Sequence, residues 1–128
     1  MLPRFIQKLK HLTTAQQVGQ RGEDAALAYL EARGLRCVTR NYRCKGGEID
    51  LIMQHRDSLV FVEVRARSRS DFGSAADSIT AAKRKRVQHA AQHYLLRTQD
   101  MPACRFDVVT IDTGRVDWVQ NAFDMPSE

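Results

Sequence analysis

The chain has 128 residues, of which 43% are hydrophobic and 27% are charged, and its formal net charge is +5. This composition fits one globular domain and excludes a disordered chain, and the positive excess is compatible with a polyanion such as nucleic acid. No apolar run approaches the ~20 residues of a membrane span, and the basic N-terminal segment lacks the features of a signal peptide. We therefore expect a cytoplasmic protein with a loose lead-in at 1–12, one domain at 13–123 and a tail at 124–128.

The first predicted element is a helix within residues 13–34. Its apolar and small residues recur at the spacing of one buried helical face: Val18, Gly22, Ala25, Ala26, Tyr29 and Leu30. Thr13 or Thr14 fits the N-cap, and Gly34 fits the position after the last turn. Gly19 and Gly22 each lower helix stability by about 1 kcal/mol relative to alanine. We therefore expect another backbone or a ligand to approach the helix closely at these glycines.

Three strands and a turn are predicted next. The strands cover residues 35–43, 48–53 and 58–66, and the last of them is rich in β-branched and aromatic residues. The Lys45-Gly46-Gly47 sequence between the first two strands is typical of a turn.

A second helix and two final strands complete the predicted order. The helix runs from about Ala81 to Arg97 with Thr80 as its N-cap, and its apolar face is Val87, Ala90, Ala91, Tyr94 and Leu95. The strands cover 104–112 and 115–123, joined by a turn at Thr113 and Gly114. The order αβββαββ predicts an α/β or α+β domain with a central mixed sheet.

The hairpin at residues 47–66 alternates apolar and charged side chains, which therefore point to opposite faces. One set of rows is Ile49, Leu51, Met53 and Val60, Val62, Val64, Ala66, and the other is Glu48, Asp50, Ile52 and Phe61, Glu63, Arg65, Arg67. The two apolar rows must share a face, because a slip of one residue would move carboxylates into the core.

A tight turn at residues 56–57 fixes the register of this hairpin. It predicts that Asp50 lies opposite Glu63 and that Glu48 lies opposite Arg65. Opposite side chains have Cβ atoms about 4.5–5.5 Å apart, so the two carboxylates repel each other. Solvent, a shared proton, a neighbouring cation or a divalent metal such as Mg²⁺ would relieve the repulsion. The alternatives to a metal site are a solvated polar face and, for Glu48 with Arg65, an ordinary cross-strand ion pair.

Several motifs of the chain match those of a known family. They are GQRGE at 19–23, GEIDLI at 47–52, FVEVRAR at 61–67, TxxK at 80–83 and RFDVV at 105–109. Their combination closely resembles the bacterial YraN family, over roughly residues 15–112. That family is similar to the restriction-endonuclease-like superfamily with the PD-(D/E)XK motif, and in particular to archaeal Holliday-junction resolvases. The resemblance implies a restriction-endonuclease-like core.

The resemblance also implies a metal-dependent site. Its catalytic residues would be Asp50, Glu63, Arg65 and Glu23, and Mg²⁺ or Mn²⁺ would be held by Asp50, Glu63 and the backbone carbonyl of Val64, with Glu23 and Glu48 as further candidate ligands. The chain departs from the motif at Arg65, which stands where the motif has lysine. Because arginine does not lose its proton in proteins, Arg65 can orient water or stabilise charge but cannot act as a base.

Basic residues at the start of the second predicted helix are candidate nucleic-acid contacts. They are Lys83, Arg84, Lys85 and Arg86, and Arg67 joins them from the hairpin. Positive charge opposes the dipole at a helix N-terminus, and bound phosphate would offset that effect. A solvated basic face is the alternative.

Two further pairs favour structural roles. His89 and His93 have helical spacing but no third zinc ligand is evident, so a surface or partly buried pair is expected. Trp118 and Phe123 could stack on bases, but a single Trp in a short strand is more often packed.

Three functions follow as hypotheses. The first is an endonuclease that hydrolyses phosphodiester bonds of DNA, with branched or damaged DNA as a candidate substrate. The second is a nuclease-fold module that binds nucleic acid without efficient catalysis, which Arg65 favours. The third is a protein-interaction subunit whose polar face is only solvated. A homodimer is a candidate because the resolvase-like relatives work as dimers, although no sequence feature identifies a dimer surface.

Overall fold

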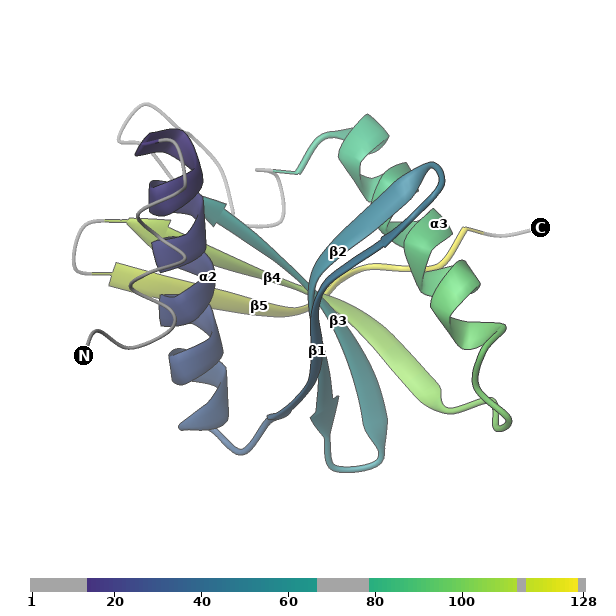
Figure 1. Ribbon diagram of the computed structural model, residues 1–128. Helices are drawn as coiled ribbons and strands as arrows, with labels where there is room; N and C mark the ends of the chain where they lie inside the picture. Colours follow the sequence, from purple (N-terminus) through teal and green to yellow (C-terminus); the bar gives the residue numbers. More distant parts are fainter. Residues whose placement is uncertain (1–13, 67–78, 113–114, 127–128) are drawn as a thin grey trace, which may run out of the picture.

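The computed structural model describes residues 14–66, 79–112 and 115–126 (Figure 1). Its elements are α2 (Thr14–Glu31), β1 (Arg36–Cys44), β2 (Gly47–His55), β3 (Ser58–Ala66), α3 (Ala81–Leu95), β4 (Ala103–Asp112) and β5 (Arg115–Phe123). This is the predicted order αβββαββ, and the class is α+β, consistent with a restriction-endonuclease-like core. The predicted lead-in at 1–12, the Thr113-Gly114 turn and Arg67 lie outside the described residues.

The five strands form one mixed sheet in the order β1-β2-β3-β4-β5. Neighbouring strands are antiparallel except for β3 and β4, which are parallel. Parallel neighbours need a crossover connection, and α3 lies within it. The two helices lie on opposite sides of the sheet (Figure 1). No helix in the described ranges is long and apolar enough to cross a membrane.

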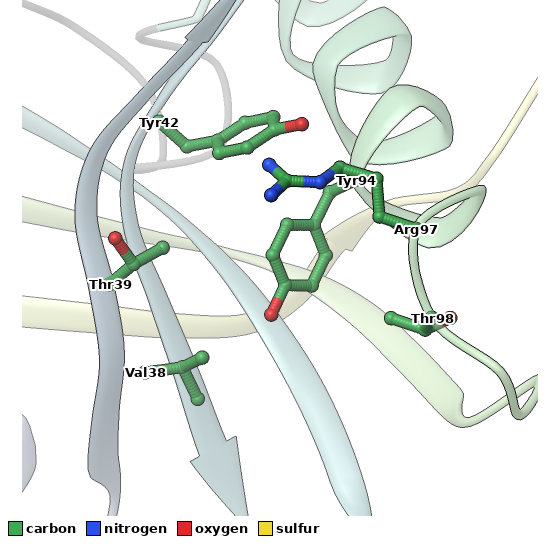
Figure 2. Close-up of a pocket in the computed structure, with 6 residues that line it drawn as sticks. All are labelled: Val38, Thr39, Tyr42, Tyr94, Arg97 and Thr98. Carbon is green, nitrogen blue, oxygen red and sulfur yellow. The ribbon is translucent and has the colours of Figure 1, made fainter.

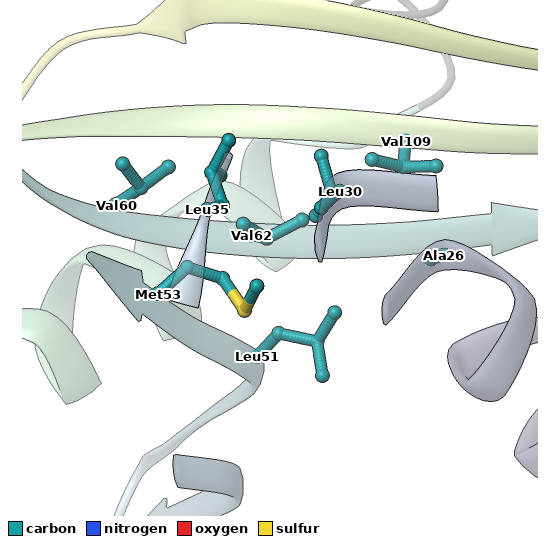
Figure 3. Close-up of a cluster of buried hydrophobic side chains, with 8 residues drawn as sticks. All are labelled: Ala26, Leu30, Leu35, Leu51, Met53, Val60, Val62 and Val109. Atoms are coloured by element: carbon teal, nitrogen blue, oxygen red, sulfur yellow. The ribbon is translucent and has the colours of Figure 1, made fainter. Parts of the chain in front are cut away.

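The α2 side of the sheet holds one hydrophobic core. Ala26 and Leu30 of the helix pack here against the central strands, and the cluster as a whole comprises Ala26, Leu30, Leu35, Leu51, Met53, Val60, Val62 and Val109 (Figure 3). Ala26 and Leu30 were predicted to be buried, whereas Ala25, predicted on the same face, is exposed. This core buries the apolar rows of β2 and β3 from Leu51 onward, as the alternation predicts.

The α3 side of the sheet holds a second core, so this side is not the solvated polar face that the sequence left open as an alternative. Buried residues on this side are Ile49, Ile52, Leu59, Phe61, Val87, Ala90, Ala91 and Phe106. The expected alternation also fails at Ile49, which packs with Ile52 rather than with Leu51. Opposite this point in β1, Asn41 has a φ of 53°. The β1–β2 register is unchanged across this left-handed residue, from Arg40↔Leu51 to Tyr42↔Ile49, and it shifts between Cys37 and Thr39.

Glycine brings β2 against α3. A Cβ on Gly47 would meet the carbonyl of Arg86 and lie 3.0 Å from the amide nitrogen of Ala90, so only glycine fits this approach. The described residues do not show the close approach expected at Gly19 and Gly22. Among them, nothing lies within 4 Å of a Cβ on Gly19, and a Cβ on Gly22 would meet only Ile111, at 4.0 Å.

Two predicted caps are confirmed. The Thr80 hydroxyl accepts a hydrogen bond from the N–H of Lys83 (3.1 Å) at the start of α3. Gly34 follows α2 with a φ of 94°, and the next residue, Leu35, donates its N–H to the carbonyl of Leu30. The first cap fixes the start of α3 beside β2.

Candidate active site

The carboxylates of Asp50 and Glu63 meet where the β2–β3 ladder ends. The register Leu51↔Val62 and Ile52↔Phe61 continues to place these two residues opposite each other, as predicted. At this point, hydrogen bonds from backbone N–H groups to the two carboxylates replace the backbone–backbone hydrogen bonds of the ladder. The N–H of Asp50 donates to Glu63 Oε1 (3.3 Å), and the N–H of Val64 donates to Asp50 Oδ2 (2.9 Å). Each carboxylate is therefore held by the backbone of the opposite strand through one oxygen.

Glu63 is a buried carboxyl group with an unfilled acceptor. The residue is 0% exposed, and its Oε2 has no hydrogen-bond partner among the described residues. Burial, then the charge of Asp50, raise the pKa of Glu63 to about 8, although the positive charge of Lys83 acts in the opposite direction. Burying an ionised carboxylate without full pairing is costly. The fold thus tolerates an unfavourable group at this position.

Asp50 and Glu23 add negative charge around Glu63. Burial raises the pKa of Asp50, against the N–H of Val64 and the charge of Lys83. Glu23 reaches the same region from α2. Its pKa is raised by burial and then by the charge of Asp50, so the two carboxyl groups influence each other. Three acidic side chains from α2, β2 and β3 therefore share one electrostatic environment.

A lysine from α3 approaches these carboxylates. Lys83 Nζ lies 3.6 Å from Glu63 Oε2 and 3.4 Å from Glu48 Oε1. Despite partial burial, the charges of Glu63, Asp50 and Glu48 raise the pKa of Lys83. The sequence places Lys83 among phosphate-gripping residues, whereas the structure brings it to the acidic cluster itself.

Arg65 does not make the contact that the register suggests. Glu48 is paired with Lys83, with Arg43 of β1 (3.8 Å) and with Arg86 of α3 (3.7 Å), and no contact with Arg65 occurs among the described residues. The β2–β3 ladder stops before the expected Glu48–Arg65 pair, and α3 fills that space. The Arg65 Nε is buried without a hydrogen-bond partner among the described residues.

The donor set fits a hard divalent cation only together with other ligands. The described residues contain no group of three or more His, Cys, Asp or Glu side chains arranged to hold a metal. Mg²⁺ commonly takes one or two carboxylates and completes its octahedron with water and substrate phosphate. Asp50 and Glu63 suit that mode, and Glu63 Oε2, which accepts no hydrogen bond from the described residues and lies 3.6 Å from Lys83 Nζ, is a candidate donor. Because the N–H and C=O of one strand residue point the same way, the Val64 carbonyl faces the side on which Asp50 lies.

Comparisons with known proteins connect this geometry to a family. The family described as "Uncharacterised protein family UPF0102" matches residues 22–111. The chain belongs to the UPF0102 family. A UPF0102 protein of Cupriavidus necator is 54% identical over 124 residues, 96% of this chain and 94% of the relative. One of Herminiimonas arsenicoxydans is 51% identical over 123 residues, 96% of this chain and 98% of the relative.

A third UPF0102 protein, from Dechloromonas aromatica, is 55% identical over 116 residues, 91% of this chain and 94% of the relative. The family match is consistent with the YraN and nuclease-like resemblance of the motifs. The matched range of this UPF0102 chain contains the whole acidic cluster and Lys83, and it ends before β5.

The remaining basic residues of α3 have different surroundings. Arg84 lies over the ring of Phe123, with 5.7 Å between its guanidinium carbon and the ring centre. Lys85 is exposed. Arg86, one helical turn after Lys83, is 56% exposed at its side chain while it contacts Glu48. The four basic residues therefore do not form one uniform face.

A second buried carboxylate occurs at Asp107 in the RFDVV motif. Its two oxygens accept hydrogen bonds from Arg105, from Trp118 Nε1 (2.9 Å) and from the N–H of Asn121 (2.9 Å). Arg105 also contacts the ring nitrogen Nδ1 of His55. The network ties β4 to β5, and it assigns Trp118 a packing role rather than an exposed stacking surface.

The paired histidines also have protein neighbours. His89 Nε2 lies 2.9 Å from the carbonyl of Lys45, and His93 Nδ1 is hydrogen-bonded to the Tyr42 hydroxyl. Both histidines are exposed, as expected for a surface pair, and both connect α3 to the β1–β2 hairpin.

A pocket of about 320 Å³ lies between β1 and the C-terminal end of α3, and contains none of the acidic residues. It is lined by Val38, Thr39, Tyr42, Tyr94, Arg97 and Thr98 (Figure 2). The rings of Tyr42 and Tyr94 pack edge to face with centres 5.3 Å apart, and Arg97 lies 6.0 Å from the Tyr42 ring. These contacts join the helix to the hairpin.

Sequence reasoning missed three residues of β1. Arg40 Nη2 lies 2.7 Å from Asp24 Oδ1 and 3.7 Å from Glu23 Oε2. The side-chain amide of Asn41, with its nitrogen turned toward Glu23, donates to both Glu23 carboxylate oxygens at 3.3 Å. Arg43 pairs across the strand with Glu48. The turn at Gly46 could have revealed Arg43, because it sets the β1–β2 register. The positive φ of Asn41 had no comparable signal.

Proposed function

We propose that this protein is a metal-dependent endonuclease that hydrolyses phosphodiester bonds, with DNA as its substrate. The observation that carries the proposal is the acidic pair Asp50 and Glu63, in which one oxygen of a buried carboxylate accepts no hydrogen bond from the part of the chain that the structure describes. Structural carboxylates in cores normally have their acceptors filled. Unsatisfied buried groups with strongly shifted pKa values are concentrated at functional sites.

The residues have separate roles in this proposal. Asp50 and Glu63 would hold Mg²⁺ or Mn²⁺ through the oxygens not fixed by the backbone, with the Val64 carbonyl as a third donor. Glu23, held by Arg40 and Asn41, would position a water molecule. Glu48 would act on the site through its ion pair with Lys83. The bound metal would polarise the phosphate and lower the pKa of water.

The charge around the acidic cluster supports a polyanionic substrate. Arg43 and Arg86 flank Glu48 with side chains that are 75% and 56% exposed, and Lys85 is exposed nearby on the same helix. Such cations position a phosphate backbone without reading its sequence. Branched or damaged DNA is the substrate class that the resolvase-like resemblance suggests.

A cleavage assay tests the proposal. The purified protein is incubated with duplex, single-stranded and four-way-junction DNA in Mg²⁺, Mn²⁺ or EDTA. We expect cleavage that requires metal and falls by about 10³-fold or more in Asp50→Asn, because one carboxylate of the pair is neutralised. Asp100→Asn is the matched control, since Asp100 is exposed after α3. Cleavage that persists in EDTA, or equally in Asp50→Asn and Asp100→Asn, would contradict the proposal.

A nucleic-acid-binding module without efficient catalysis is the second candidate. The observation that favours it is Arg65 at the position of the motif lysine. In the same assay, binding that weakens steeply with salt, with no cleavage under any metal condition, would select this alternative. If the protein neither binds nor cleaves DNA, both functions are ruled out.

A further inference from the structure

We infer that Lys83, rather than Arg65, is the catalytic cation of the proposed site. This inference rests on the endonuclease function proposed above. It reassigns Lys83 from general phosphate binding to the reacting phosphate.

Lys83 lies beside the acidic pair. It reaches the pair from α3, with its Nζ 3.6 Å from Glu63 Oε2, which accepts no hydrogen bond from the described residues. Arg65 follows Glu63 by two residues in β3, but it makes no contact with the carboxylates among the described residues. A phosphate that meets the Glu63 oxygen would therefore meet Lys83 before Arg65.

Lys83 is more accessible to solvent than Glu63. The Lys83 side chain is 25% exposed, whereas that of Glu63 is 1% exposed. A substrate can thus reach the ammonium group from solvent while the carboxylate remains behind it. The local dielectric is reduced at such a boundary, so one positive charge stabilises negative charge more strongly than on an open surface.

Several contacts hold the Lys83 side chain in place. The start of α3 is fixed by the Thr80 cap on the N–H of Lys83 itself. Gly47 allows the helix backbone to lie against β2. Glu48, anchored by Arg43 and Arg86, holds Nζ at 3.4 Å from the other side. Glu48 is accordingly a positioning residue, and its carboxylate keeps Lys83 near the site when a metal takes the Glu63 oxygen.

The chemical step needs charge stabilisation from Lys83. The oxygen of a water molecule forms the new bond to phosphorus, and the proton that this water loses passes to solvent. The bond from phosphorus to the leaving sugar oxygen breaks and its electron pair stays on that oxygen, which takes a proton from solvent. Lys83 keeps all its protons and stabilises the negative charge on the non-bridging oxygens in the transition state.

The test separates rate from affinity. Single-turnover cleavage at saturating DNA is measured in Mn²⁺, and the Kd for DNA is measured by fluorescence anisotropy in EDTA. We expect Lys83→Met to lower the cleavage rate by about 10²-fold or more, while its Kd stays close to that of the control Lys45→Met, at an exposed lysine of the β1–β2 turn that the proposed site does not use. Lys83→Arg should restore at least a tenth of the rate, because charge is retained. Arg65→Met should lose less than tenfold.

Three results would overturn the inference while leaving the endonuclease function intact. The first is Lys83→Met cleaving as fast as Lys45→Met. The second is a defect of Lys83→Met that lies only in Kd, which is the behaviour of a phosphate-gripping residue. The third is Arg65→Met losing as much rate as Lys83→Met. If the wild-type protein cleaves no DNA in any metal, the proposed function fails and this inference falls with it.

Discussion

Two buried carboxylates, Glu63 in β3 and Asp107 in β4, lie one residue out of step in neighbouring parallel strands and face opposite sides of the sheet. Both residues are 0% exposed. Asp107 has both oxygens filled by Arg105, Trp118 and the backbone of Asn121. Glu63 has one oxygen on a backbone N–H, and the other accepts no hydrogen bond within the described ranges.

The difference separates a structural carboxylate from a candidate catalytic one. Burial alone does not distinguish them, since both are fully enclosed. The satisfaction of the acceptor oxygens does, because an unfilled buried acceptor lowers stability and persists only where something else requires it. Each of the following predictions changes one side of this comparison.

The largest effect on stability is expected at Asp107. Asp107→Asn would put an amide NH₂ against N–H donors and leave the Arg105 guanidinium without its carboxylate. We expect the free energy of unfolding, measured in urea, to fall by about 3 kcal/mol or more. Asp57→Asn, in the exposed hairpin turn, is the control. An Asp107 variant as stable as this control would remove the structural half of the comparison.

Substitution of Glu63 is expected to increase stability. Glu63→Gln keeps the shape of the side chain but removes the buried ionisation, so we expect the free energy of unfolding at pH 8 to rise by about 1–2 kcal/mol. Metal-dependent cleavage should be lost in the same variant. Glu31→Gln, on the exposed end of α2, is the matched control. A clear loss of stability in Glu63→Gln would mean that Glu63 is a structural group like Asp107.

A pH dependence of stability follows from the same group. The pKa of Glu63 rises from 4.5 to about 8 on folding, so between these values the folded state holds a proton that the unfolded state has lost. Increasing pH in this window therefore favours the unfolded state, by up to about 1.4 kcal/mol per pH unit. The raised pKa values of Asp50 and Glu23 act in the same direction.

Urea unfolding across pH 5–8 measures this dependence. Wild-type stability should fall as pH rises, and the fall should be shallower in Glu63→Gln. Equal slopes in the two proteins would show that Glu63 does not carry the proton.

The smallest effect is expected from one donor of Asp107. Trp118→Phe keeps an aromatic ring near Tyr29, whose ring centre is 6.5 Å from that of Trp118, but it removes the hydrogen bond to Asp107. We expect a loss of about 1 kcal/mol in unfolding free energy, because Arg105 and Asn121 still fill the carboxylate. DNA cleavage should be unchanged. A cleavage defect would extend the functional site to the Asp107 network.

Patterns of short range predicted most of the fold. The strand alternation and the turn at residues 56–57 gave the register that brings Asp50 opposite Glu63. Capping chemistry located the start of α3 at Thr80. These features depend on neighbouring residues, so one sequence carries them.

Contacts between distant elements were harder to predict. The hairpin register predicted an ion pair between Glu48 and Arg65. Instead, α3 packs on that side of β2, and its Lys83 and Arg86 pair with Glu48. The polar face was open to a solvated interpretation, because the pattern of one hairpin does not show that a helix covers it. The Asp107 network was not predicted either, because its hydrogen-bond donors come from β5 as well as from β4 itself.

Binding of Mn²⁺ at pH 8, measured by isothermal titration calorimetry, tests the central claim most directly. The claim is that Glu63 keeps an unfilled oxygen for a divalent cation. We predict one Mn²⁺ per wild-type chain, with an affinity that increases from pH 6 to pH 8 as Glu63 loses its proton. Glu63→Gln should not bind, and Glu31→Gln should bind like the wild type. Equal Mn²⁺ binding by Glu63→Gln and the wild type, or no binding by the wild type, would contradict the account.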